Sequence, residues 1–203
     1  MLRATWIAVF LGVLIWSGIN PKDFPTWCLE VAPAVVAGAV LWFTRERFPL
    51  TPLAYALVLV HCVILMVGGH YTYAEVPLGE WFQELTDGTR NNYDKLGHIA
   101  QGFVPAIVAR EIVIRLDVFN SARWRDFFII SFCLGMSAFY ELIEWWVALL
   151  SEEAAESFLG TQGYAWDTQS DMGWALLGAI VALLTLSRLH DRQLRELQYA
   201  DEV

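Results

Sequence analysis

Lysine is nearly missing from this 203-residue sequence, and cysteine is scarce. The two lysines, Lys22 and Lys95, form no basic cluster, and the formal net charge is −9. The chain therefore lacks the cationic surface that attracts nucleic acids and anionic lipid, and no nucleic-acid partner is expected. The three cysteines stand alone in or beside apolar stretches, without a CxxC pair. Their isolation argues against a disulfide framework and against a thiolate metal site.

Charged residues are also few. They make up 17% of the chain, against 57% hydrophobic residues and ten Trp, which is the balance of a membrane protein. Six apolar stretches approach or exceed the ~17 to 25 residues that cross about 30 Å of hydrocarbon as a helix. These stretches are Ala4–Ile19, Thr26–Phe43, Leu53–Gly69, Lys95–Leu116, Asp126–Leu150 and Asp171–Leu186. The sequence predicts an all-α polytopic membrane protein, with six transmembrane helices in one bundle and a single domain over residues 1–203.

The orientation of this bundle follows from its basic residues. With a cytoplasmic N-terminus, ten arginines fall on the inner side, and only Lys22, Arg90 and Lys95 fall on the outer side. Cytoplasmic loops carry such an excess of basic residues in membrane proteins. We therefore expect both termini to be cytoplasmic.

Two long outer loops are expected, at about residues 70–93 and 151–170, and both are rich in acids. In the first, Leu78, Trp81, Phe82 and Leu85 recur at helical spacing after Pro77. This pattern is typical of a short amphipathic helix at the headgroup level, and a loop packed over the bundle is the alternative.

Ionisable residues within or beside the apolar stretches gather in the outer half of the predicted bundle. They are Asp94, His98, Glu141, Glu144, Asp167 and Asp171. Spacings of i, i+3 or i, i+4 put the members of each stretch on one helix face. At 1.5 Å per residue, Glu141 lies ~14 Å below the outer end of its helix. A carboxylate at that depth costs roughly 2.5 kcal/mol or more to insert, so it must face the bundle interior and pair, protonate or bind a cation.

Carboxylates and imidazoles in this number suit Zn²⁺, Mn²⁺ or another divalent ion, which can activate a water molecule. His70 is included among the ligands because two preceding glycines let the backbone turn freely. The sequence leaves open whether a metal is bound and whether the protein is an enzyme. The candidate metal ligands are His98, Glu141, Glu144, Asp94, Asp171, His70 and Asp167, and the candidate catalytic residues are Glu141, Glu144 and His98.

The same residues have structural interpretations. Asp94 and Asp167 suit the first turns of helices, where a carboxylate satisfies free backbone N–H groups. Asp94 and His98 can form an interfacial ion pair together with the neighbouring lysine. Glu141 and Glu144 can be a hydrogen-bonded pair that only holds helices together.

Four segments resemble those of the YjdF-like family of bacterial inner-membrane proteins. They are His70-Tyr-Thr-Tyr-Ala-Glu-Val-Pro77, Asn92-Tyr-Asp-Lys-Leu-Gly-His-Ile-Ala-Gln-Gly-Phe103, Glu141-Leu-Ile-Glu-Trp145 and Asp167-Thr-Gln-Ser-Asp171. The resemblance covers nearly all of the chain after the first apolar stretch. It implies a multi-pass protein of the bacterial inner (plasma) membrane and no particular reaction.

A second, more distant resemblance is to the VanZ-like pattern, with Asp-Lys-x-x-His opening one helix, Glu-x-x-Gln in the next and Asp before a small-residue helix. Asp94-Lys95-x-x-His98, Glu141-x-x-Glu144 and Asp167-x-x-x-Asp171 followed by Gly178 are similar to it. Glu144 replaces the Gln, and the Asn that usually follows the last Asp is missing. VanZ-like proteins are associated with glycopeptide-antibiotic resistance and cell-envelope phenotypes, so the resemblance implies a role in the envelope.

The leading interpretation is an integral inner-membrane protein with a one-sided polar site at its extracytoplasmic face. This site binds a divalent cation and acts on an envelope lipid or a lipid-linked substrate, with membrane lipids as partners. A small proton- or ion-coupled transporter and a non-catalytic accessory protein are the alternatives. A transporter needs polar groups toward the inner face, where the sequence offers little beyond His61, Arg110 and Glu111. The oligomeric state is left open.

Overall fold

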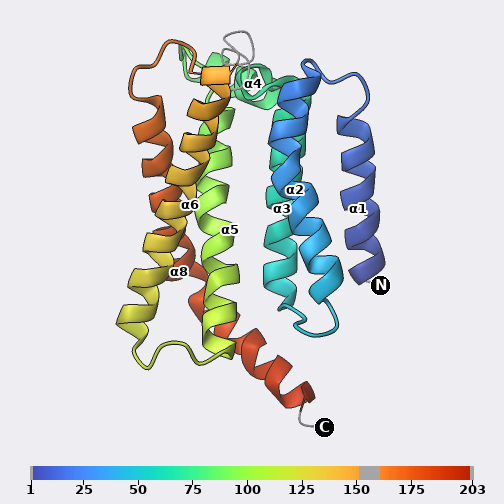
Figure 1. Ribbon diagram of the computed structural model, residues 1–203, viewed down its shortest axis with the longest axis vertical. Coiled ribbons are helices and arrows are strands. Elements are labelled where there is room, and N and C mark those ends of the chain that lie inside the picture. Colours follow the sequence, from blue (N-terminus) through green and yellow to red (C-terminus); the bar gives the residue numbers. More distant parts are fainter. Residues whose placement is uncertain (1, 151–160, 202–203) are drawn as a thin grey trace.

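The computed structural model describes residues 2–150 and 161–201, and the regular structure in these ranges is entirely helical. Long helices run side by side, and the short α4 lies at one end of the bundle (Figure 1). The elements are α1 (Leu2–Ser17), α2 (Phe24–Thr44), α3 (Pro52–Tyr71), the 3-10 helix η1 (Tyr73–Glu75), α4 (Pro77–Leu85), α5 (Tyr93–Arg115), α6 (Ala122–Leu150) and α8 (Asp167–Asp201).

In the described part of the chain, five helices are long and apolar enough to cross a membrane: α2, α3, α5, α6 and the Asp167–Leu197 part of α8. The sixth expected span, α1, is apolar but has only 16 residues. The prediction of an all-α protein with several transmembrane helices is therefore confirmed. α8 continues far past the expected end at Leu186 and projects from the bundle (Figure 1).

Capping side chains and prolines set the starts of α2 and α3. The carboxylate of Asp23 accepts a hydrogen bond from the N–H of Thr26 at 2.8 Å, and the Thr51 hydroxyl accepts one from the N–H of Ala54 at 3.3 Å. These bonds satisfy N–H groups that have no acceptor within the helix. Pro52 follows its cap directly, where a missing N–H costs nothing.

The first of the two long loops contains the helix that the sequence predicts. α4 begins at Pro77 and leaves four large apolar side chains exposed: Leu78, Trp81, Phe82 and Leu85. An exposed apolar face is what a helix at the headgroup level requires. Of the second loop, residues 151–160 lie outside the described residues, and residues 167–170 belong to α8.

α5 and α8 pack closely because small residues line their contact. A Cβ at Gly102 would collide with the carbonyl group of Ala175, and one at Gly178 would collide with the carbonyl group of Ile99. Small residues permit this approach in membrane proteins, where lipid tails offer no hydrophobic drive for helix association. The contact brings the first turns of α5 and α8 together, and these turns carry most of the candidate site.

At the end opposite α4, a buried polar cluster joins α3, α5 and α8. The carboxylate of Glu111 accepts hydrogen bonds from the N–H and the hydroxyl of Thr51 at 2.8 and 2.7 Å, and lies 3.0 Å from His190 Nε2. Arg110 contacts His190 Nδ1 at 3.0 Å and the carboxylate of Asp191 at 2.6 Å. Both oxygens of Glu111 are engaged, so the cluster is a structural joint between these helices.

The α5–α8 contact generates a prediction about stability. Gly178→Ala should destabilise the protein by about 1 to 3 kcal/mol, because the added methyl group forces two backbones apart. Gly173→Ala on the same helix is the matched control, since a Cβ there meets nothing within 4 Å. This control should be neutral or stabilising, because Ala has the higher helix propensity. Thermal unfolding of both variants in detergent decides the matter, and equal unfolding temperatures would contradict the assigned packing.

Candidate functional site

The first turns of α5 and α8 meet the α4-side half of α6 and bring six ionisable side chains into the same end of the bundle. We call them the acid–histidine cluster: Asp94 and His98 of α5, Glu141 and Glu144 of α6, and Asp167 and Asp171 of α8. His98, Glu141, Asp167 and Asp171 are buried. The residues that the sequence selected on three separate stretches thus gather in one region.

The imidazole of His98 lies at the centre of this cluster. Its Nδ1 donates a hydrogen bond to Gln101 Oε1 at 3.0 Å, which fixes the orientation of the ring. Its Nε2 faces carboxylate oxygens of Asp94 at 3.2 Å, Glu141 at 3.8 Å and Asp171 at 4.0 Å. A histidine held through one nitrogen, with the other directed at several carboxylates, has the arrangement of a metal ligand with a supporting hydrogen bond.

Two overlapping groups of side chains have the spacing of metal ligands. Asp94, His98 and Asp171 form one, and His98, Glu141 and Glu144 form the other, and within each group one ligand atom per residue lies within 4.8 Å of the others. Mixed nitrogen and oxygen ligands of this kind suit Zn²⁺ or Mn²⁺. Since His98 belongs to both groups, one ion beside its Nε2 could draw on either.

Several buried polar atoms in this region have no hydrogen-bond partner within the described chain. They include Glu141 Oε1, Asp171 Oδ1 and the hydroxyl of Ser137. Ser137 lies one turn before Glu141 on α6 and is completely buried. Because a buried polar atom without a partner is costly, these three atoms mark places where a ligand can bind.

Arg90 supplies positive charge at the edge of the acid–histidine cluster. Its guanidinium forms ion pairs with Asp167 at 2.5 Å and Asp94 at 3.6 Å. Asp167 is in neither metal-ligand group among the described residues, so its placement favours an ion pair over a ligand role. Lys95 donates a hydrogen bond from Nζ to the hydroxyl oxygen of Ser170 at 2.9 Å.

The structure does not bring His70 to the cluster. Its Nδ1 lies 2.9 Å from the carbonyl oxygen of Ser17, and its ring packs on Trp16 and Tyr71 with centroid distances of 4.6 Å. The two glycines before His70 do not turn the chain, because α3 continues through Tyr71. Gly68 instead lies against the ring of Tyr73.

Sequence reasoning missed Glu30, a buried carboxylate on α2. Its Oε2 accepts a hydrogen bond from the hydroxyl of Tyr140 on α6 at 3.0 Å. The available signal was the same one that selected Glu141, because Glu30 is the only acidic residue in its predicted span. Arg90 was also missed as a partner, and its position before Asp94 by i, i+4 was the signal.

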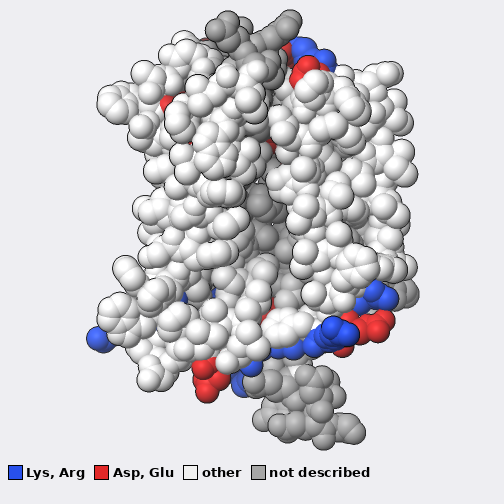
Figure 2. Space-filling view, viewed as in Figure 1, with Lys and Arg blue, Asp and Glu red and all other residues white. Residues whose placement is uncertain are grey.

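A large groove leads from the cluster between α2 and α3 on one side and α5 and α6 on the other. Its volume is about 810 Å³. Glu30, Asp94, His98 and Glu144 line its polar end, and the rest of the wall is mostly apolar. Burial raises the pKa of Tyr73, which also lines this end, well above its ordinary value, so its hydroxyl stays neutral. Figure 2 shows the hollow between the two halves of the bundle.

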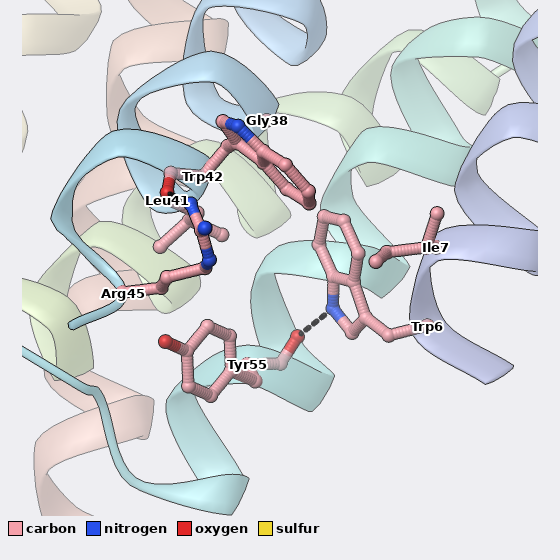
Figure 3. A pocket seen from close by; sticks show the side chains of 7 residues that line it. All are labelled: Trp6, Ile7, Gly38, Leu41, Trp42, Arg45 and Tyr55. Atoms are coloured by element: carbon pink, nitrogen blue, oxygen red, sulfur yellow. Dashed lines mark hydrogen bonds between the residues drawn. The ribbon is translucent and has the colours of Figure 1, made fainter. Parts of the chain in front are cut away.

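A smaller cavity of about 210 Å³ lies between α1, α2 and α3 (Figure 3). Trp6 forms part of its wall and donates a hydrogen bond from Nε1 to the carbonyl oxygen of Tyr55 at 2.8 Å. Arg45 is the charged residue of the lining and stacks over Trp42, 4.0 Å from the ring centroid. Within the described ranges no carboxylate or histidine lines this cavity, so it is separate from the acid–histidine cluster.

Comparison with known proteins agrees with a membrane location. Residues 2–192 match the family described as "Predicted membrane protein (DUF2238)". The chain is 51% identical over 183 residues to the Inner membrane protein YjdF of Escherichia coli (strain K12), and the alignment covers 90% of this chain and 88% of that protein. No solved structure matches. The YjdF-like resemblance and the inner-membrane localisation are confirmed, and the chain belongs to the DUF2238 family of membrane proteins.

Proposed function

We propose that this protein binds a divalent cation at the acid–histidine cluster and uses this site to act on an envelope lipid or a lipid-linked substrate. The single observation that carries the proposal is the position of His98 Nε2, which faces three carboxylates within 4.0 Å. Each of these three residues, Asp94, Glu141 and Asp171, also has a buried oxygen without a hydrogen-bond partner in the described chain. A cation beside Nε2 would satisfy these oxygens together.

The charge balance of the cluster supports a bound cation. Asp94, Glu141 and Asp171 face a single imidazole, and Glu144 adds a fourth carboxylate. Arg90 is engaged with Asp94 and Asp167 at the edge. Burying several carboxylates against one imidazole is unfavourable unless more positive charge is present or protons are shared.

The cluster also contains groups that can perform proton transfer. A bound divalent cation lowers the pKa of a coordinated water and polarises a phosphoryl or carbonyl oxygen. Glu141 and Glu144 lie one turn apart on α6, so either can serve as a ligand while the other accepts or returns a proton. The adjoining groove gives an apolar substrate access to these groups from one side.

The proposal places this site at the extracytoplasmic face of a six-span bundle. α1 then crosses the membrane as the sixth span, with both termini in the cytoplasm. α1 begins and α8 ends at the end opposite α4 (Figure 1). Lys and Arg side chains gather at that same end (Figure 2), as the cytoplasmic side of an inner-membrane protein requires.

A one-sided site is favoured over a transport path. His98 and Glu111 both lie on α5, 13 residues and therefore about 20 Å apart along the helix. The Glu111 cluster is satisfied by its own partners Thr51 and His190. α5 residues between the two clusters, such as Val104, Ala106 and Ile107, are buried and apolar.

Metal content tests the proposed cation site. Elemental analysis of wild-type protein purified without chelator should show close to one divalent ion per chain, and His98→Ala, Glu144→Gln and Asp171→Asn should each lose it. The same variants should unfold at lower temperature, because a ligand bound only by the native state stabilises it, by about 2.7 kcal/mol at 100 times its Kd. His70→Ala is the control and should keep the ion, since His70 contacts Ser17 and lies outside both ligand groups.

Two other outcomes would contradict this site. A proton relay gives metal-free wild-type protein, near-normal folding of Glu144→Gln and a stability that varies with pH. A purely structural ion pair gives metal-free protein and a loss of about 3 to 5 kcal/mol when His98 is removed.

Orientation is tested by thiol labelling in intact cells. After replacement of the three native cysteines, single cysteines are introduced at Glu84 in α4 and at Asn120 between α5 and α6, two exposed positions at opposite ends of the bundle. A membrane-impermeant maleimide should label position 84 and leave position 120 unlabelled until the cells are opened. The reverse pattern would move the site to the cytoplasmic face.

A further inference from the structure

The groove has the depth and the exposure of a site for a hydrocarbon chain. On α5 its lining runs from Asp94 to Ile112, which is 18 residues or about 27 Å of helix, close to the thickness of a bilayer core. Lining residues on the α2 and α6 rims are exposed: Val36 by 61%, Phe132 by 50% and Met136 by 45%. The groove is therefore open along its side, in the direction from which a membrane lipid would enter.

The two walls of the groove are joined by a side-chain bridge at the polar end. α2 packs mainly on α3, and α6 packs on α5 and α8. The hydrogen bond from the Tyr140 hydroxyl to Glu30 Oε2 spans the space between α2 and α6. Glu30 is 4% exposed and lines the groove, so this buried carboxylate faces whatever enters the polar end.

The charges on the groove wall indicate which kind of lipid head group would bind there. Among the residues that the structure describes, three carboxylates line the groove, those of Glu30, Asp94 and Glu144, and no Lys or Arg does. Glu30 belongs to neither group of candidate metal ligands, so a cation bound at either group would leave Glu30 without a positive partner. The Glu30 carboxylate accepts the hydrogen bond from the Tyr140 hydroxyl, so it lies beside an aromatic side chain. Carboxylates beside aromatic rings are the surroundings that a primary ammonium group prefers.

We propose that the groove binds an amphiphile with a primary ammonium head, its chain lying between α2 and α6 and its head beside Glu30 and Tyr140. The inference rests on the proposed function for a lipid as substrate, and it names the class of that lipid. It assigns a substrate-binding role to Glu30, which is separate from the metal ligands. The ammonium group would donate to the Glu30 carboxylate, which still accepts the hydrogen bond from Tyr140.

Photo-crosslinking with two matched probes tests this inference. Purified protein in detergent is illuminated with hexadecylamine or hexadecanol, each with a diazirine in the middle of its chain, and the labelled peptides are mapped by mass spectrometry. The amine should label groove residues such as Val36 and Met136 at least about tenfold more efficiently than the alcohol, because a charged hydrogen bond in a desolvated site has a value of that order. Glu30→Gln should remove the preference for the amine, since the amide has the same shape and no charge.

A steric variant tests the place of binding. Ala32→Trp puts a large ring into the groove and should abolish labelling by both probes, whereas Ala39→Trp, also exposed on α2 but outside the groove, should leave labelling unchanged. Equal labelling by amine and alcohol in the wild type would overturn the ammonium head, and labels spread evenly over the helices would overturn the groove. Metal content should be unaffected in Glu30→Gln, so a failure here is distinguishable from the absence of a cation site.

Discussion

The burial of carboxylates inside an apolar bundle is the constraint on which the arrangement of this protein depends. A charged group in such surroundings is stable only with a partner, and the chain meets the requirement in two ways. At one end, Glu111 is saturated by Thr51 and His190. At the other end, one imidazole faces three carboxylates, and oxygens of Glu141 and Asp171 have no hydrogen-bond partner in the described chain. The first cluster joins helices, and the second has capacity left for a ligand.

Helix packing gives the second cluster a closed side and an open side. On the closed side, Gly102 and Gly178 let α5 and α8 approach until backbone meets backbone, and this contact sets Asp171 against His98. On the open side, α2 is held mainly by α3, and the groove separates it from α6. A site that is closed toward α8 and open toward the groove suits a ligand that enters from the membrane. Glu30 lies on the opposite wall of the groove.

Much of the architecture could be predicted from the sequence because membrane spans are determined by local hydropathy. A helix satisfies its backbone hydrogen bonds within one segment. The helical structure of each apolar stretch can therefore be predicted from that stretch alone. The short α4 was predictable for the same reason, from the spacing of Leu78, Trp81, Phe82 and Leu85. The set of buried acids was also visible, since a carboxylate inside an apolar stretch is conspicuous in any topology.

What the sequence by itself determined was therefore the helical class, most of the spans and the residues from which a site can be built. Tertiary structure decided which of these residues meet. It joined Glu30 to Tyr140 across 110 positions, paired Arg90 with Asp167, and directed His70 to Ser17 instead of the cluster. These outcomes depend on the rotation of each helix about its axis and on the choice of neighbours. Both are set by small-residue contacts such as that of Gly178 with Ile99, which no local pattern of hydropathy records.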